Sequence, residues 1–496
     1  MMQQNVLKPF LIIVISLIVI GLISQSIFNL QYVLFWTDAL LFLLIMAIFL
    51  FVLFARQKPY IKQSWMKVFK RPVGMATFLI LMVYVFFGVL DSIHFKSNLM
   101  DKNQKVVVSA SVKSVLDVIL TPLSDRVEKT YSAPFATHLF VKENVEQSDG
   151  TISRQFPRLK YGGAHLKDPI KDKSTDIFWR FFMGLFLSLI IIGVVVFLLM
   201  WVLKIRLSYM SEKDVLGEVC AGKGGELPWR TIILTFSGIT ILVCVAIMLS
   251  TKYHVLGTDK VGQDVLFLSL KSIRTGLLIG TLSTLVMLPF AIALGVMAGY
   301  YRGWVDDVIQ YIYTTLNSIP SVLLIAAAVL MVVVHLDNYP VPISTEERAD
   351  LRLLFLCIIL GITSWTGLCR LLRGETLKLR ELDYVQAAQT YGVSHLAIMW
   401  RHIVPNVMHI VVIYVALDFS ILILAEAVLS YVNVGVDPAM NSWGNMINSA
   451  RLEMAREPVV WWSLMAAFIF MFTLVLTANL FSDVVRDAFD PRLNNA

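Results

Sequence analysis

The chain has 496 residues, of which 57% are hydrophobic and only 16% are charged. Soluble domains carry roughly a quarter charged residues, so this composition excludes a soluble globular protein. The four cysteines have no metal-ligand spacing, and none lies in the polar segment 93–177, so neither a metal site nor a disulfide framework is predicted. The net charge of +7 reflects membrane topology and gives no support for nucleic-acid binding. The chain is predicted to be a polytopic membrane protein.

Ten apolar runs are long enough to cross a bilayer as helices, which need roughly 20 residues at about 1.5 Å each. Helices are expected because unpaired backbone groups are not tolerated in lipid. The predicted spans lie near 10–30, 38–55, 74–91, 178–203, 232–250, 275–300, 308–335, 352–370, 406–430 and 459–482.

The distribution of Lys and Arg predicts the orientation of these spans. Segment 56–71 is rich in basic residues and has no acidic residue, which is typical of a cytoplasmic segment. Both termini are then predicted to be cytoplasmic, although the basic residues of 251–274 argue mildly against this. The run 10–30 is expected to be an uncleaved helix, and the alternative is a cleaved signal peptide.

Composition divides the chain into three regions. Residues 1–203 form a membrane extension that contains the polar insert 93–177, predicted to be a small external domain. A cytoplasmic linker, 204–230, leads into a block of six spans, 231–496. The insert is expected either to contact a partner protein or to be a structural elaboration without separate activity.

The sequence contains no complete catalytic motif. Gly217–Gly224 has part of a phosphate-binding pattern, but Gly224 stands where a Ser or Thr should hold magnesium, so a chance match is the preferred interpretation. No enzyme activity and no cofactor in this chain are predicted.

Three ionisable residues lie in the predicted span 406–430: His409, Asp418 and Glu426. Charged groups in lipid are costly, so they are functional candidates. Asp418 and Glu426 are about 80° apart around a helix, so both could line a translocation path. The alternative is hydrogen bonding to a neighbouring helix. Pro289 and Pro320 also lie in predicted spans and indicate kinks.

The polar stretch 371–405 is predicted to contain a short helix that projects from the membrane. Good helix formers are followed by the small residues Ala387 and Ala388, Gly392 then permits a break, and Pro405 restarts a helix. Another protein could approach the small residues closely. The alternative is an ordinary solvated loop.

This stretch resembles the coupling loop of ABC importer permeases, in which Glu-Ala-Ala, three residues and Gly precede a later Pro. The ending resembles the dipeptide and oligopeptide branch, in its C-type permease. Gln386 stands where the family usually has Glu, which puts a charged contact to an ATPase in doubt. The resemblance assigns docking to an ATPase to this loop, with the residues Gln386, Ala387, Ala388, Gly392, His402 and Pro405.

Further landmarks of the same branch follow in order along 231–496. Gln263 replaces the family's usual Arg in the first of them. The matching residues are Gly257, Thr258, Asp259, Gly262 and Asp264 before one span, Gly299–Asp306 and Ser318–Pro320 around the next, Leu429–Gly435 with Ser442, Trp443 and Gly444 in a late external loop, and Asp487–Arg492 in the C-terminal tail.

The resemblance implies an all-α fold: a six-helix ABC importer permease core, preceded by about four extra transmembrane helices and an external insert. It also implies a second related permease, one or two cytoplasmic ATPase subunits that bind ATP and magnesium, and an external substrate-binding protein. The expected place is the bacterial inner membrane and the expected cargo is peptide. Nickel complexes, antimicrobial peptides or peptide-like toxins are alternative cargoes. An ATPase-independent carrier or channel, or a sensor or scaffold, are alternatives of another class.

Overall fold

The computed structural model describes residues 30–100, 106–108, 112–146, 152–206, 227–338 and 344–489. The predicted span near 10–30, the Gly217–Gly224 segment and most of the linker lie outside these residues. Within them, eight helices are long and apolar enough to cross a membrane, or nine if one bent pair counts as a span. The predicted all-α membrane fold is confirmed.

The long helices are α2 (Trp36–Arg56), α4 (Pro72–Asp91), α7 (Asp172–Arg206), α9 (Trp229–Ser250), α10 (Val265–Tyr301), α13 (Thr345–Arg380), α16 (Val404–Tyr431) and α18 (Trp462–Phe489). The shorter ones are α3 (Pro59–Lys70), α5 (Val115–Ile119), α6 (Thr121–Ser124), α11 (Gly303–Ser318), α12 (Ser321–Asp337), α14 (Asp383–Thr390), α15 (His395–Ile398), the π-helical turn η1 (Met399–Ile403) and α17 (Trp443–Glu453). The strands are β1 (Leu30–Val33), β2 (His94–Met100), β3 (Val106–Val108), β4 (Lys113–Ser114), β5 (Glu143–Glu146) and β6 (Ile152–Gln155).

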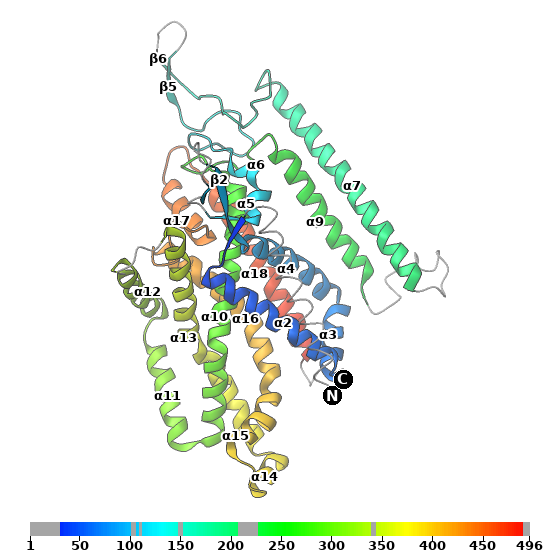
Figure 1. The fold of residues 1–496 in the computed structure, drawn as a ribbon, viewed down its shortest axis with the longest axis vertical. Coiled ribbons are helices and arrows are strands. Elements are labelled where there is room, and N and C mark those ends of the chain that lie inside the picture. Colours follow the sequence, from blue (N-terminus) through cyan, green and yellow to red (C-terminus); the bar gives the residue numbers. More distant parts are fainter. Residues whose placement is uncertain are drawn as a thin grey trace.

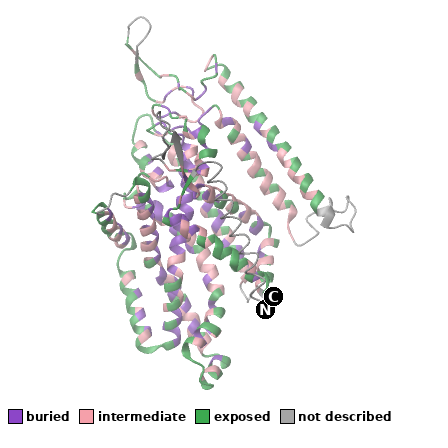
Figure 2. Cartoon of the chain, in the orientation of Figure 1, coloured by how far each residue is buried: buried purple, intermediate pink, exposed green. Residues whose placement is uncertain are grey.

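Helices α10, α13 and α16 form the centre of the bundle, where buried residues are concentrated (Figures 1 and 2). Glycine lets α10 and α13 approach closely, because a Cβ at Gly295 would lie 2.8 Å from the carbonyl oxygen of Cys369. Helix α4, from the N-terminal extension, packs against α10 and α18, and Tyr84 Oη donates a hydrogen bond to the Phe470 carbonyl at 2.9 Å. The extension is therefore joined to the core along the length of α4.

The predicted span near 308–335 is sharply bent at Pro320, where the sequence indicates a kink. The chain forms two helices there, α11 and α12, which meet at an angle of 88°. The break lies at Ile319, whose backbone is extended (φ −90°, ψ 131°), and Pro320 follows it. Proline lacks a backbone donor and disfavours the helical conformation of the preceding residue, so the helix ends there.

Helices α7 and α9 run side by side at the edge of the bundle, and α9 also contacts α4 (Figure 1). Gly184 on α7 permits the close approach, since a Cβ there would lie 2.8 Å from the Cα of Val245. Most of α7 is exposed (Figure 2). This apolar surface is suited to contact with lipid.

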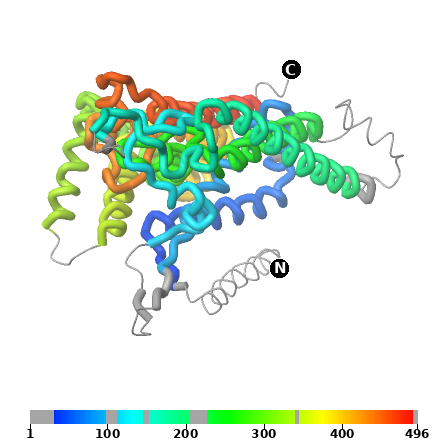
Figure 3. Tube along the Cα trace, turned by 90° about the horizontal axis from the view of Figure 1, so that it is seen from above, coloured from blue at the N-terminus to red at the C-terminus, as the bar shows by residue number. Residues whose placement is uncertain are grey.

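The insert contains two short helices and the strands β2 to β6, and β1, which precedes α2, joins one of its two antiparallel sheets. Strand β2 pairs with β1, β3 and β4, while β5 and β6 form a separate two-stranded ribbon. Helix α7 begins at Asp172, so the insert ends before the predicted boundary at 177. Seen from above, the insert lies across the core helices (Figure 3). We call this the insert end of the molecule, and the opposite end, with α14 and α15, the coupling end (Figure 1).

Candidate functional site

The predicted projecting helix is present at the coupling end as α14. Gly392 ends this helix with φ +74°, a conformation that favours glycine, and a Cβ there would meet no atom within 4 Å. Gln386 and Ala387 are exposed, whereas Ala388 packs partly against the core. The sequence pattern thus forms a helix with one face buried and one face open.

Large apolar side chains are exposed beside this helix. Tyr391 is 87% exposed and Trp400 is 70% exposed. Contiguous exposed apolar side chains mark binding surfaces. We define the coupling surface as Tyr384, Gln386, Ala387, Tyr391, Gly392, Leu396 and Trp400.

The other two predicted residues of this loop lie at its C-terminal end. His402 is half-buried in η1, with its ring 6.1 Å from that of Tyr384, and its carbonyl accepts a hydrogen bond from Asn406 Nδ2. Pro405 is exposed in the first turn of α16, where its missing donor is tolerated.

The turn between α10 and α11 supports the coupling loop. Tyr300 Oη lies 2.8 Å from His395 Nδ1, and Gln389 Nε2 donates to the same hydroxyl at 3.2 Å. Arg380 donates to the Tyr300 carbonyl at 2.8 Å. Val385 of α14 is fully buried below these contacts. The coupling surface is therefore fixed to the end of α10.

The landmark Gly257–Asp264 forms a loop at the insert end, which we call the signature loop. Gly257 and Gly262 both have positive φ values, and a Cβ at Gly262 would collide with the carbonyl of Glu128 in the insert. Asp259 Oδ1 accepts the backbone N–H of Gln263 at 2.8 Å, so Gln263 in place of Arg leaves this turn closed. Asp264 caps α10 by accepting the N–H of Leu266.

Thr258 joins the signature loop to the insert and the core. Its hydroxyl accepts the backbone N–H of Ser132 at 2.7 Å and donates to the carbonyl of Thr130 at 2.9 Å. Its carbonyl accepts a hydrogen bond from Trp462 Nε1 at 2.9 Å. The sequence singled out this loop but gave no sign that the insert rests on it.

The landmark Ser442–Gly444 starts α17. Ser442 Oγ accepts the N–H of Asn445 at 2.9 Å, and Trp443 Nε1 donates to the Ser269 carbonyl on α10 at 3.1 Å. A Cβ at Gly444 would lie 2.6 Å from Glu426 Oε1, so this glycine allows α17 to approach α16. These residues shape the loop and its packing.

Asp418 and Glu426 are both buried in α16. Glu426 accepts a hydrogen bond from Ser430 at 2.7 Å, while Asp418 Oδ2 has no hydrogen-bond partner among the described residues. His409 lies near the start of α16 and contacts the Asn406 carbonyl at 2.8 Å. A role for the two carboxylates in a translocation path stays a prediction.

His254 connects the insert to the signature loop electrostatically. Its Nδ1 lies 2.7 Å from Asp264 Oδ2, and its Nε2 lies 3.5 Å from Glu128 Oε1. Burial opposes the charged ring, but the carboxylates of Asp264 and Glu128 outweigh it and raise the pKa of His254 to about 9. The ring is therefore a cation between two carboxylates at neutral pH.

We expect the contact between insert and signature loop to weaken as pH rises. The pKa of an unfolded histidine is about 6.5, so the stabilisation is complete below that value and is lost as pH rises through about 9. The protection factors of residues 128–135, which correct hydrogen exchange for its intrinsic pH dependence, should fall over this range, and His254→Gln should remove that fall. Protection factors in the native chain that are lowest on the acidic side of neutrality would contradict this assignment.

The structure also contains a buried ionic cluster that the sequence reasoning missed. Arg274 on α10 lies between two carboxylates, 2.6 Å from Asp38 on α2 and 3.9 Å from Asp350 on α13. His94 Nδ1 contacts the other oxygen of Asp38 at 2.8 Å. These ionisable groups lie outside the span 406–430, in which the sequence analysis placed its candidates.

Lys271, one turn before Arg274, continues the cluster. Its ammonium lies 2.6 Å from Asp91 and 2.9 Å from Asp117, so it links α10 to α4 and to the insert. These groups border a cavity of about 230 Å³. The signal in the sequence was the pair of cations three residues apart, which places both on one helix face.

Comparison with known proteins identifies the class. Residues 291–495 match the family described as binding-protein-dependent transport system inner membrane component. A glutathione transport system permease of Pectobacterium atrosepticum is 33% identical over 244 residues, 49% of this chain and 74% of the relative. An oligopeptide transport system permease of Mycobacterium tuberculosis is 33% identical over 238 residues, 48% of this chain and 76% of the relative.

A dipeptide transport system permease of Lactococcus lactis is 30% identical over 239 residues, 48% of this chain and 64% of the relative. The chain therefore belongs to the family of binding-protein-dependent ABC transport permeases. It is a multi-span permease component of the inner membrane, and these relatives are transport subunits.

Proposed function

We propose that this chain is the transmembrane permease subunit of an ATP-driven peptide importer. The observation that carries the proposal is the coupling surface, an exposed aromatic and small-residue face on a helix that is fixed to the end of α10. A partner seated on this face can move α10 without first deforming the loop. The named cargoes of three relatives, glutathione, oligopeptides and dipeptides, support peptide as cargo.

The proposed assembly contains a second related permease, one or two cytoplasmic ATPase subunits and an external substrate-binding protein. ATP and magnesium bind to the ATPase subunits, and this chain is non-catalytic. The coupling end and both termini face the cytoplasm, while the insert end faces outward. Residues 1–203 extend the permease core, with the insert on its outer side.

We expect the purified chain to co-elute with a second permease and ATPase subunits in mild detergent. Proteoliposomes made from that complex, together with its substrate-binding protein, should accumulate labelled peptide only when ATP is supplied on the coupling side. An ATPase variant unable to hydrolyse ATP is the control. Uptake by the chain alone would contradict the proposal and favour an ATPase-independent carrier.

A further inference from the structure

The β5–β6 ribbon presents one exposed face of mixed chemistry. In its register Asn144 pairs with Arg154 and Glu143 pairs with Gln155. Side chains alternate along a strand, so Ile152, Arg154 and Phe156 share a face, and Lys142 joins them opposite Phe156. The Lys142 ammonium lies 5.4 Å from the centre of the Phe156 ring.

This face is open to solvent, and we call it the ribbon face: Lys142, Ile152, Arg154 and Phe156. Ile152 is 72% exposed and Phe156 is 47% exposed. A two-stranded hairpin is marginally stable in water unless something covers its apolar face. Aromatic residues and arginine are enriched at protein–protein interfaces, and Phe156 and Arg154 are both exposed here.

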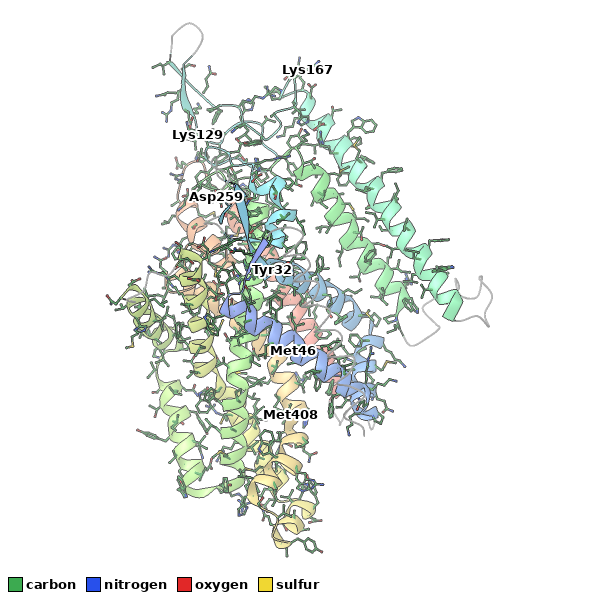
Figure 4. The ribbon with its side chains drawn as sticks, in the orientation of Figure 1. Tyr32, Met46, Lys129, Lys167, Asp259 and Met408 are labelled. Atoms are coloured by element: carbon green, nitrogen blue, oxygen red, sulfur yellow. The ribbon has the colours of Figure 1, made fainter. Side chains whose placement is uncertain are left out.

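The surface around the ribbon face is strongly basic. Within residues 112–144 and 152–171, whose side chains the structure describes, the exposed basic side chains are Lys113, Lys129, Lys142, Arg154, Arg158, Lys160, Lys167 and Lys171, against one exposed acidic side chain, Asp125. Lys129 and Lys167 both lie at the insert end, beyond Asp259 of the signature loop (Figure 4). Such a field attracts an acidic partner.

The opposite face of the ribbon is joined to the body of the insert. Glu143 Oε2 lies 2.6 Å from Lys129 Nζ, and Leu139 N–H donates to the Pro157 carbonyl at 2.8 Å. Residue 129 adjoins Glu128, whose backbone N–H bonds to Gly262 of the signature loop at 2.9 Å. The ribbon is therefore connected to the start of α10 through the body of the insert and the signature loop.

We propose that the ribbon face docks an acidic surface of the substrate-binding protein. The inference rests on the proposed function and adds where the binding protein attaches. A protein occupant fits because Ile152 and Phe156 offer apolar anchors, whereas a simple polyanion would use the basic side chains alone. The insert is then the receiving platform for the loaded binding protein.

The test measures the affinity of the complete transporter in nanodiscs for the purified substrate-binding protein of the same system. The double variant Lys142→Glu/Arg154→Glu should raise the dissociation constant at least tenfold and reduce its dependence on salt concentration. Phe156→Ala should weaken it several-fold at any salt concentration. Lys113→Glu, which reverses an exposed lysine on β4 outside the ribbon face, is the matched control and should change affinity less than twofold. Basal ATP hydrolysis should be unchanged in all variants.

Equal affinity of native and ribbon variants would overturn the inference while leaving the proposed function intact. Polyglutamate serves as a polyanion probe: if the variants lose polyglutamate binding but keep the binding protein, the ribbon face is a polyanion site and the inference is wrong. If the binding protein neither binds nor stimulates ATP hydrolysis in the native complex, both the inference and the proposed function fail.

Discussion

Replacing Arg274 by alanine is expected to lower the free energy of unfolding by about 3–5 kcal/mol. The guanidinium is 7% exposed and donates to Asp38 at 2.6 Å and to the Thr37 hydroxyl at 3.2 Å. Its removal would leave the buried carboxylates of Asp38 and Asp350 without their shared cation. The loss is measured by chemical unfolding of the purified chain in detergent.

Arg348→Ala is the matched control. It removes an arginine from the same part of the molecule, but its ion pair with Asp337 is exposed on both sides. Exposed pairs contribute about 0–1 kcal/mol, so stability should hardly change. Equal losses in the two variants would show that burial of the ionic cluster contributes nothing beyond a surface pair.

Gly392→Leu is expected to reduce ATP-driven uptake at least tenfold while the protein remains folded and inserted. A left-handed backbone costs an L-residue about 1–2 kcal/mol, so the turn after α14 would change its path. The added side chain would also stand on the coupling surface. Uptake and ATP hydrolysis are measured on the same proteoliposomes, where hydrolysis without uptake is the expected signature.

Two further variants separate strain from bulk at this position. Asparagine tolerates positive φ better than leucine, so Gly392→Asn should retain more uptake. Gly238→Leu adds the same side chain on α9 in equally open space and should be neutral. Native uptake in Gly392→Leu would rule out the coupling assignment of this loop.

The sequence predicted the helices well where apolar runs determine them. The predicted helices are shorter than the observed ones where polar residues continue a helix beyond its apolar run. Helix α10 begins at Val265 because Asp264 caps it, ten residues before the predicted start. Periodicity and hydropathy report the lipid-facing part of a helix, and they give no signal for its polar ends.

The sequence predicted the part of the candidate site that depends on local conformation. Gly392 and Pro405 have local conformational roles, so the coupling loop was visible in the sequence. The ionic cluster was not, because Asp38 and Arg274 are 236 residues apart and meet only through the fold. Pro320 was recognised as a disturbance, but the 88° change of direction depends on how α12 packs.

Helix α10 has 37 residues, which makes it about 55 Å long and far longer than the roughly 30 Å of hydrocarbon it crosses. Its first turn begins beside His254, and its last turn holds His395 through Tyr300. Pro289, where a helix bends most easily, divides it into arms of about 36 Å and about 18 Å. For a given change of angle at Pro289, the end of α10 beneath the insert therefore moves about twice as far as its end at the coupling loop.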